Sequence, residues 1–397
     1  MKKIYVFIVL GVMTLEGKAK TKMFQTIYLE NFGAIYNDGS SDQIAFEAAL
    51  EYAYTISKFQ PVIQISSGTL LLEHKLILKE QNITIKGMGM SRSKLVWSHT
   101  NGGIEAKIVN STQNKVIEIS DVSLLAAAED TGVGLYIRRQ NTPLISVVLK
   151  NVKIASLNPT CYWKQNAILS LTPIAKVSNC VFEGMYGVTD SLLTFDDFCV
   201  ASTLVNCTFS GAETAISVVG RGEGYMFREN TISNVDYGIK RSLTSSVSKA
   251  TEPLMHLIEN DITASKICIE AEGLSSTSIS NNTLILDGRN KIDQKYGLLL
   301  GGGINIERGI SIYDNTFINH GNKADVIAIS TYELDGPISV QKNVFTNFKI
   351  GVSVHSNSDN EMTLGQNKLI NDGIEDCNNL YKVDKESREI YTDKTCE

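Results

Sequence analysis

Two glutamates occupy the same place in a short phrase that recurs along the chain, and they are the first candidates for chemistry. Glu229 precedes the asparagine of FRENTI, and Glu259 precedes that of LIENDI. On neighbouring β-strands such residues lie about 5 Å apart, and two carboxylates that close repel, which raises the pKa of one and prepares an acid/base or acid/nucleophile pair. A separation of about 5 to 5.5 Å is typical of retaining glycosidases, and a wider pair leaves room for the water of an inverting enzyme. The same carboxylates can instead hold a Ca²⁺ ion, or both can be solvated turn residues.

A second group of charged residues lies a few positions after Glu229. Enzymes that cleave uronate polymers by β-elimination need a base for the proton α to the carboxyl group and a cation that neutralises the carboxylate. Asp236, Lys240 and Arg241, together with Glu229, supply both kinds of group within one repeat. The alternative is an ordinary salt-linked surface, in which Lys240 pairs with Glu270 on the next strand.

Tyrosines recur near these charges. The phrases that align begin at Tyr186, Thr214, Tyr237, Ile267 and Tyr296. Their alignment places one column three residues further on: Thr189, Ser217, Lys240, Glu270 and Leu299. The three tyrosines can stack on sugar rings, or they can pack on the faces of a sheet.

The elements that must position these residues are short repeated strands. The asparagine position of the phrase is filled in turn by Ile83, Val122, Val152, Cys180, Cys207, Asn230, Asn260, Asn282, Asn315, Asn343 and Asn367. Two residues later stand Ile85, Leu124, Ile154, Phe182, Phe209, Ile232, Ile262, Leu284, Phe317, Phe345 and Leu369. A period of roughly 20 to 50 residues is typical of stacked repeats, and short β-branched phrases between Gly, Asn and Asp favour strands over helices. The sequence therefore predicts an all-β fold, a single right-handed parallel β-helix.

The asparagine column has its own physical role. At a bend between strands the backbone leaves amides and carbonyls without ladder partners, and stacked Asn side chains can bond each other and those groups. Asn can instead mark solvent-facing turns. The shared register with the apolar column favours an inward ladder, which is structural and carries no catalysis.

The chain has 397 residues and a formal net charge of −6. It lacks a basic run of the kind that binds nucleic acid, and no segment is apolar enough to span a membrane. Residues 1–19 have the basic and apolar regions of a signal peptide, so we expect a secreted or periplasmic protein. The alternative is an amphiphilic N-terminus that is not cleaved. Residues 20–397 then form the β-helix domain, with a C-terminal tail at 375–397. A disulfide between Cys377 and Cys396 would tie down that tail.

Residues 41–56 are expected to form a helix before the repeats. The stretch is rich in Ala, Glu and Leu, which favour helix. Its apolar face is predicted from the helical spacing of Ala45, Ala49, Tyr52, Ala53 and Ile56. Such a helix can cover the apolar end of a solenoid.

The stretch from residue 27 to residue 89 resembles the pectate-lyase-like superfamily. Its N-terminal pattern is matched by Asn31-Phe32-Gly33-Ala34, Asp38-Gly39, Asp42, Ala45, Ala49, Ile65, Gly68 and Ile85-Lys86-Gly87-Met88-Gly89. Asn31 replaces the usual Asp, and Leu70 replaces the usual Tyr. The superfamily includes pectate lyases, polygalacturonases, tailspike depolymerases and epimerases, so the resemblance implies a right-handed β-helix acting on polysaccharides. Fold analogy by itself does not name the reaction.

Fragments of the polygalacturonase site motifs also occur. Asp196-Asp197 is similar to the paired aspartates of that family, Asn319-His320-Gly321 to its GHG motif, and Gly238-Ile239-Lys240 to its RIK motif. The last two stand in the reverse of the family's order. The resemblance thus adds Asp196 and Asp197 to the candidate catalytic residues.

The predicted function is that of an exported polysaccharide-degrading enzyme, either a lyase or a glycoside hydrolase. We expect its site on the coils of residues 196–270, where acids and bases gather. No resident cofactor is predicted, although a Ca²⁺ ion can join the site. The alternatives are a glycan-binding surface or adhesion protein without activity and a phage-type tailspike.

Overall fold

Most of the described chain is β-strand. The computed structural model describes residues 24–56, 60–109, 114–140, 145–172, 174–222, 224–243, 254–289, 295–303, 309–322, 326–334, 336–355, 361–383 and 389–392. Its helices are a 3₁₀ turn at Leu29–Phe32 and α1 at Gln43–Thr55. Within these residues the strands pair in parallel, apart from one antiparallel pair near the C-terminus.

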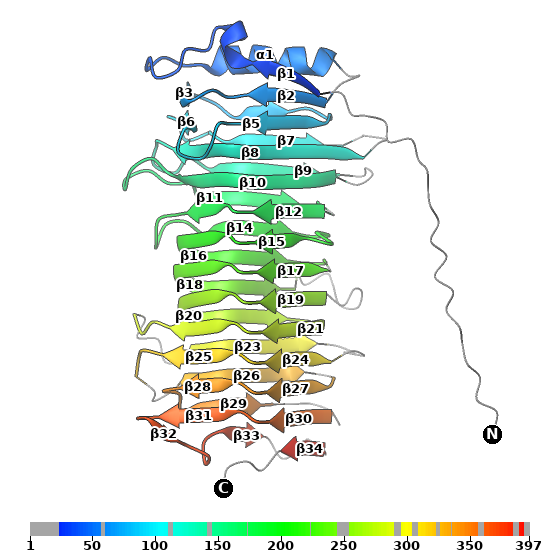
Figure 1. Ribbon diagram of the computed structural model, residues 1–397, viewed down its shortest axis with the longest axis vertical. Coiled ribbons are helices and arrows are strands. Elements are labelled where there is room, and N and C mark those ends of the chain that lie inside the picture. Colours follow the sequence, from blue (N-terminus) through cyan, green and yellow to red (C-terminus); the bar gives the residue numbers. More distant parts are fainter. Residues whose placement is uncertain are drawn as a thin grey trace, which may run out of the picture.

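The strands wind into successive coils that stack into an elongated rod (Figure 1). The first coils contain β1 Phe24–Tyr28, β2 Gln60–Gln64, β3 Gly68–Leu72, β4 Leu76–Leu78, β5 Ile83–Lys86, β6 Ser93–Trp97, β7 Ile104–Ile108, β8 Lys115–Ala126, β9 Val133–Arg139, β10 Ile145–Ser156 and β11 Gln165–Ser170. The middle coils contain β12 Ile174–Ser178, β13 Val181–Glu183, β14 Ser191–Asp196, β15 Thr203–Val205, β16 Thr208–Val219, β17 Tyr225–Arg228, β18 Thr231–Ser242, β19 Leu254–Ile258, β20 Asp261–Glu272, β21 Ser275–Ser280, β22 Thr283–Leu286 and β23 Lys295–Gly303. The last coils contain β24 Ile310–Tyr313, β25 Thr316–Asn319, β26 Val326–Leu334, β27 Ile338–Gln341, β28 Val344–Thr346, β29 Ile350–Val354, β30 Glu361–Gly365, β31 Lys368–Asn371, β32 Ile374–Glu375, β33 Tyr381–Val383 and β34 Glu389–Thr392.

The fold is a right-handed parallel β-helix, as the sequence predicts. The predicted apolar column is continuous from Leu124 to Leu369, because each member pairs with its counterpart on the next coil. All of these side chains are buried. In a coil of parallel strands, alternate side chains of each strand point into the core. The apolar column found in the sequence is one such line of inward side chains.

The prediction is wrong for the first coil. Ile83 pairs with Ile117 rather than with Val122, and Leu95 takes the place opposite Leu124. Residues 87–92 form an additional turn between β5 and β6, which shifts the register. At Gly87 a Cβ atom would lie 2.0 Å from the carbonyl oxygen of Asp121, so the close approach of these two turns requires glycine.

The inward asparagine ladder is present over its whole predicted length. Each Asn donates from its backbone N–H and from Nδ2 to the Oδ1 of the next Asn, at 2.9–3.1 Å. Cys207 extends the ladder by donating its backbone N–H to Asn230 Oδ1 at 3.0 Å. Cys180 and Cys207 are buried free thiols, so they take ladder positions without bridging.

The residue before each ladder position adopts the left-handed conformation. From Asp121 to Gln366 this column has φ between 52° and 58°. Short polar side chains tolerate that conformation best, and Asn or Asp fills six of its ten positions. Glu229 and Glu259 belong to the same column.

Helix α1 lies at the N-terminal end of the stack (Figure 1). The side chains that it buries are those of Gln43, Ala45, Phe46, Ala49, Leu50 and Ala53. The buried face thus differs from the predicted one: it includes Phe46 and Leu50, whereas Tyr52, which was predicted to be buried, is 42% exposed. Within the described ranges no helix is long and apolar enough to cross a membrane. The predicted signal peptide, residues 1–19, lies outside the described residues.

Candidate functional site

A row of charged side chains follows one bend of the coils. The pairing of Ser191 with Thr214, and of Thr214 with Tyr237, places the residue before each of them on consecutive coils. Those residues are Asp190, Glu213 and Asp236, which we call the carboxylate column. Lys266 follows on the next coil, where the pairing of β18 with β20 shifts register. Neighbouring members are thus about 4.8 Å apart at the backbone.

The carboxylate column lines a pocket. Its volume is about 310 Å³, and its walls are Tyr186, Gly187, Val188, Thr189, Asp190, Glu213, Asp236 and Lys266. We call it the acidic pocket. Three of these side chains are carboxylates, and one is a lysine.

Asp236 is the most firmly held of the three carboxylates. Its Oδ1 accepts hydrogen bonds from the Tyr186 hydroxyl at 2.6 Å and from the Ser265 hydroxyl, and Lys266 Nζ lies 2.8 Å from its Oδ2. Burial by itself raises the pKa of Asp236, but the hydrogen bonds from Lys266, Ser265 and Tyr186 outweigh it and lower the pKa. The hydrogen bond between Tyr186 and Asp236 also raises the pKa of Tyr186. Asp236 is therefore held as an anion beside a protonated tyrosine.

Asp190 and Glu213 differ in their partners. Lys164 lies 3.4 Å from Asp190, whereas no ion pair within 4 Å involves Glu213 in the described part of the chain. Glu213 is exposed and stands between two carboxylates that each have a lysine.

Tyr186 reaches this site from a loop that the sequence alignment placed wrongly. Residues 184–190 connect β13 to β14, and a tight turn returns the backbone N–H groups of Val188 and Thr189 to the carbonyl of Met185. This turn adds five residues, so Ser191 rather than Tyr186 pairs with Thr214. Thr194 consequently replaces Thr189 in the column of Ser217, Lys240, Glu270 and Leu299. The loop lets Tyr186 extend to Asp236, two coils away.

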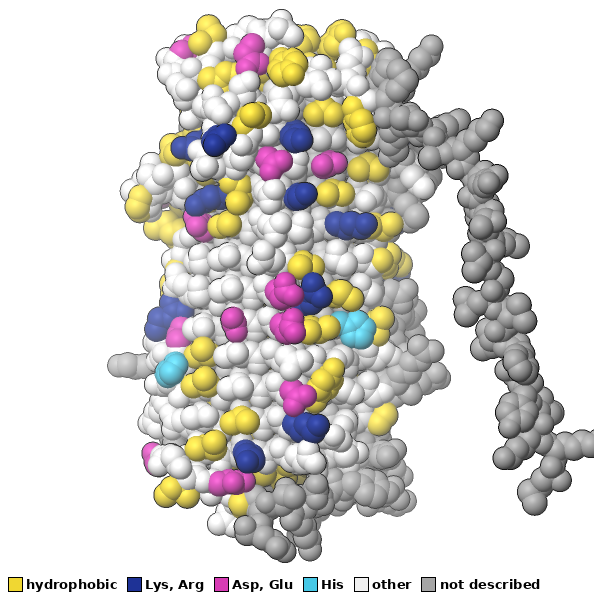
Figure 2. Space-filling model, viewed as in Figure 1, with side chains coloured by type: hydrophobic (Ala, Val, Ile, Leu, Met, Phe, Trp, Pro, Cys, Tyr) yellow, Lys and Arg dark blue, Asp and Glu magenta, His cyan; other side chains and the backbone are white. Residues whose placement is uncertain are grey.

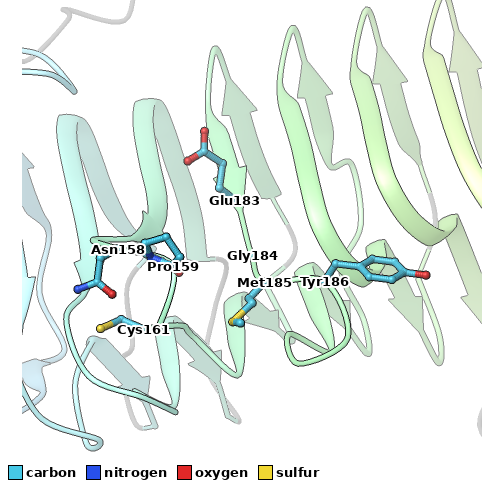
Figure 3. A pocket seen from close by; sticks show the side chains of 8 residues that line it. Asn158, Pro159, Cys161, Glu183, Gly184, Met185 and Tyr186 are labelled. Atoms are coloured by element: carbon cyan, nitrogen blue, oxygen red, sulfur yellow. The ribbon is translucent and has the colours of Figure 1, made fainter.

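A second pocket adjoins the first at Tyr186. It has a volume of about 490 Å³ and is lined by Ser156, Asn158, Pro159, Cys161, Glu183, Gly184, Met185 and Tyr186. Figure 3 shows that the loop of Asn158, Pro159 and Cys161 faces the segment from Glu183 to Tyr186. We call it the apolar pocket. Together the two pockets extend over five successive coils, roughly 20 Å along the rod.

Glu229 and Glu259 lie at a different bend. They stand on neighbouring coils as predicted, and both are exposed. Their backbone N–H groups donate to Ile258 and Ser280 in the turn, and Arg228 lies 3.3 Å from Glu229. Figure 2 shows acidic and basic side chains exposed in a row on the face that carries β17, β19 and β21. Residues 230–235 separate Glu229 from Asp236, and the five of them that belong to β18 span about 16 Å of strand. The structure therefore does not bring these two predicted residues together.

Lys240 and Arg241 point in opposite directions. Lys240 faces outward and lies 3.3 Å from Glu270, the cross-strand pair that the sequence indicates. Arg241 faces inward, is 1% exposed, and donates to the carbonyls of Glu272 and Gly220. Burial lowers the pKa of Arg241 to about 10. The structure therefore corrects the expectation that Arg241 is a cation within reach of a substrate.

Asp196 and Asp197 lie at a third bend, where β14 ends. Asp196 accepts a hydrogen bond from the Ser170 hydroxyl at 2.8 Å, and Arg221 lies 3.3 Å from Asp197. The length of β14 separates them from Asp190, roughly 20 Å. The sequence-predicted carboxylates thus occupy three bends of the coil, whereas Lys240 and Arg241 lie along β18. Among all of these residues, Asp236 alone lies in a described pocket.

Glu213, Asp190, Ser265 and Lys266 were not predicted as site residues. The signal was present for Glu213, because it precedes Thr214 as Asp236 precedes Tyr237. The same alignment missed Asp190, because the five-residue turn shifts the register so that Ser191 pairs with Thr214. Among the described residues no group of three or more His, Cys, Asp or Glu side chains is arranged to hold a metal ion.

Solved structures with the same fold include enzymes and phage proteins. The A-module of the mannuronan C-5 epimerase AlgE6 from Azotobacter vinelandii matches with a TM-score of 0.64 at 13% identity, over 92% of this chain and 97% of that one. The AlgE4 A-module from the same organism gives 0.61 at 12%, over 93% and 100%. A tailspike protein mutant of E. coli bacteriophage HK620, in complex with a pentasaccharide, gives 0.63 at 14%, over 87% and 67%. At these identities the likeness establishes the fold. No protein-family profile matches the chain, and a search of curated proteins finds no significant match.

Proposed function

We propose that this right-handed parallel β-helix protein binds an extended polysaccharide across the acidic and apolar pockets and hydrolyses a glycosidic bond at the carboxylate column. The observation that carries the proposal is the pair Glu213 and Asp236, adjacent carboxylates in a pocket with contrasting surroundings. Most glycoside hydrolases use two such carboxyl groups.

The surroundings assign a role to each carboxylate. Asp236 is kept ionised by Lys266, Ser265 and Tyr186, so it serves as the base or nucleophile. Glu213 is exposed on the neighbouring coil and has no ion-pair partner among the described residues, so its position makes it the group that protonates the leaving oxygen. A pair of groups whose environments differ in this way can divide the two tasks.

Hydrolysis fits these residues better than β-elimination does. Elimination from a uronate needs a cation that is free to neutralise the substrate carboxylate. Lys266 in the acidic pocket is already paired with Asp236, and Arg241 is buried. Three carboxylates in one pocket also repel a polyanionic substrate.

The comparisons support a polysaccharide as the ligand. Two proteins of the same fold are named as mannuronan epimerases, and a third carries a pentasaccharide. The length of the two adjoining pockets suits a ligand of several sugar rings, and the exposed ring of Tyr186 lies at their junction.

An activity panel tests this proposal. The protein is incubated with neutral and uronate polysaccharides, and both new reducing ends and the ultraviolet absorbance of unsaturated products are measured. New reducing ends without that absorbance support hydrolysis. Unsaturated products would replace hydrolysis with a lyase reaction, and glycan binding without cleavage would favour the adhesion function.

Lys266→Met is expected to move the acidic limb of the pH–rate profile to higher pH. Lys266 supplies the largest of the hydrogen bonds that lower the pKa of Asp236, so its removal raises that pKa. A reaction that needs ionised Asp236 then fails at a higher pH as the solution is acidified. Lys240→Met, which removes a lysine paired with Glu270 outside both pockets, should leave the profile in place. An unchanged acidic limb in Lys266→Met would show that the acidic limb does not report the ionisation of Asp236.

Glu229→Gln is expected to change turnover by less than about twofold. Glu229 is an exposed turn residue at another bend, and surface changes of this kind have small effects. Initial rates on the substrate found in the panel provide the measurement. A loss of activity with unchanged thermal unfolding would return the Glu229 and Glu259 pair to the site.

We also propose, from the N-terminal sequence, that the protein acts in a secreted or periplasmic location. Cys377 is disulfide-bonded, which fits an oxidising compartment. Cys396, its predicted partner, lies outside the described residues. A Ca²⁺ requirement stays a prediction of the sequence.

A further inference from the structure

The apolar pocket has a chemistry that glycosidic hydrolysis does not explain. Met185 and Tyr186 on its wall are 37% and 43% exposed, and Pro159 lines it from the opposite loop. These three side chains give one pocket a largely apolar wall, which indicates a ligand with an apolar part.

The polar groups of this pocket are mostly engaged. Lys153 lies 2.6 Å from Glu183. The Asn158 side-chain oxygen accepts from the backbone N–H and the hydroxyl of Thr160, at 3.0 and 2.7 Å. The Ser156 hydroxyl, by contrast, is buried and has no hydrogen-bond partner within the described residues. Because Ser156 lines the pocket, rotation about its Cα–Cβ bond can turn this unpaired hydroxyl toward a ligand.

An uncharged group that combines a methyl with a hydrogen-bond acceptor matches this lining. Because Glu183 is paired with Lys153, this wall offers little net charge to attract either a carboxylate or an amine. The acetamido group of an N-acetylated sugar presents a methyl for Met185 and Pro159 and a carbonyl oxygen for Ser156. Its ring lies beside Tyr186, where the acidic pocket begins.

We propose that the apolar pocket is a subsite for an N-acetylhexosamine unit of the polysaccharide. The inference rests on the proposed function, because it takes the two pockets as one binding surface. It adds the substrate class: a glycan with an N-acetylated sugar next to the bond that is cleaved. Met185 and Ser156 are its specificity-determining residues.

Ligand-observed NMR tests the subsite without any need for turnover. Saturation transfer from the Asp236→Asn protein is measured to N-acetylglucosamine and glucose, and to their β-1,4-linked tetramers. We expect the acetamido methyl to receive the strongest saturation. We expect the N-acetylated sugars to bind about fourfold more tightly or better, the factor that burial of one methyl group gives.

Two variants and a matched control locate the binding. Met185→Ala and Ser156→Ala should each reduce the preference for the N-acetylated sugar about threefold or more. Loss of the Ser156 hydroxyl leaves no partner unsatisfied, so that variant should fold normally. Met226→Ala removes a methionine of similar exposure, 40%, on β17 outside both pockets, and should leave binding unchanged.

The outcomes separate this inference from the proposed function. Equal binding of glucose and N-acetylglucosamine, or a preference that survives in Met185→Ala and Ser156→Ala, overturns the subsite. If the wild-type protein still hydrolyses a glycan of the panel in that case, the proposed function holds and only the subsite is rejected. Preferential binding of N-acetylated sugars by a protein that cleaves nothing would keep the subsite and overturn hydrolysis.

Discussion

Asp236→Asn is expected to lower the rate of glycan cleavage by about 10²- to 10⁴-fold, the usual contribution of a positioned acid or base. The amide keeps the shape of the carboxylate and still accepts hydrogen bonds from Tyr186 and Ser265. It lacks the negative charge that a base or nucleophile needs. The measurement is kcat for the cleaved polysaccharide, with thermal unfolding as a check on the fold.

The pH dependence of stability separates folding from catalysis in this variant. Because the pKa of Asp236 is lowered in the folded protein, its ionised form stabilises the wild type above the unfolded-state pKa, and that contribution is lost as the pH falls through the folded-state pKa. Asp236→Asn should therefore lose stability at neutral pH and differ less from the wild type in strong acid. Unfolding curves at both pH values test the sign.

Asp197→Asn is the matched control. Like Asp236, Asp197 is paired with a basic side chain, in this case Arg221 at 3.3 Å, but it lies at the far end of β14 from the acidic pocket. Its replacement should change the rate by less than about twofold, since surface substitutions away from a site have small effects. Equal losses in the two variants would point to a general effect of charge on the rod rather than to catalysis at Asp236.

Asn282→Leu is expected to destabilise the rod by at least about 1 to 3 kcal/mol, the cost of one unsatisfied buried polar group. The substitution removes the acceptor for the backbone N–H of Asn260, at 2.9 Å, and the donor to the carbonyls of Leu257 and Ser280. The free energy of unfolding from denaturant titration is the quantity to compare.

Thr283→Leu, the next residue, serves as its control. Thr283 faces away from the ladder at the start of β22 and is partly exposed, so its replacement should change the free energy by less than about 0.5 kcal/mol. A neutral result for Asn282→Leu would show that the ladder's hydrogen bonds add no net stability.

The fold was predictable because its strongest constraints repeat. An inward position that is apolar on every coil, such as that of Phe209 and Ile232, gives a repeated pattern in the sequence. This pattern is recognisable even where the turns between strands differ in length. The ladder asparagines also repeat along the sequence, because each one forms hydrogen bonds with the asparagine of the next coil. The register failed where turns vary in length, at residues 87–92 and 184–190, since no repeated contact fixes the length of an exposed turn.

The site was less predictable because exposed charges obey no such period. Glu229 and Glu259 share a column for a backbone reason, the left-handed turn, rather than for a chemical one. Strand alternation by itself indicates the inward direction of Arg241, two residues after the buried Ile239. The partners of Asp236 come from a loop and from a coil with shifted register, which a single-sequence alignment does not connect.

The structure of Asp236→Asn with a bound oligosaccharide of the cleaved glycan tests the central claim most directly. The account predicts that the sugar chain crosses the rod along Tyr186, with one glycosidic oxygen within hydrogen-bond distance of Glu213 and the adjoining anomeric carbon beside residue 236. A chain bound at the bend of Glu229 and Glu259, or at that of Asp196 and Asp197, would contradict it.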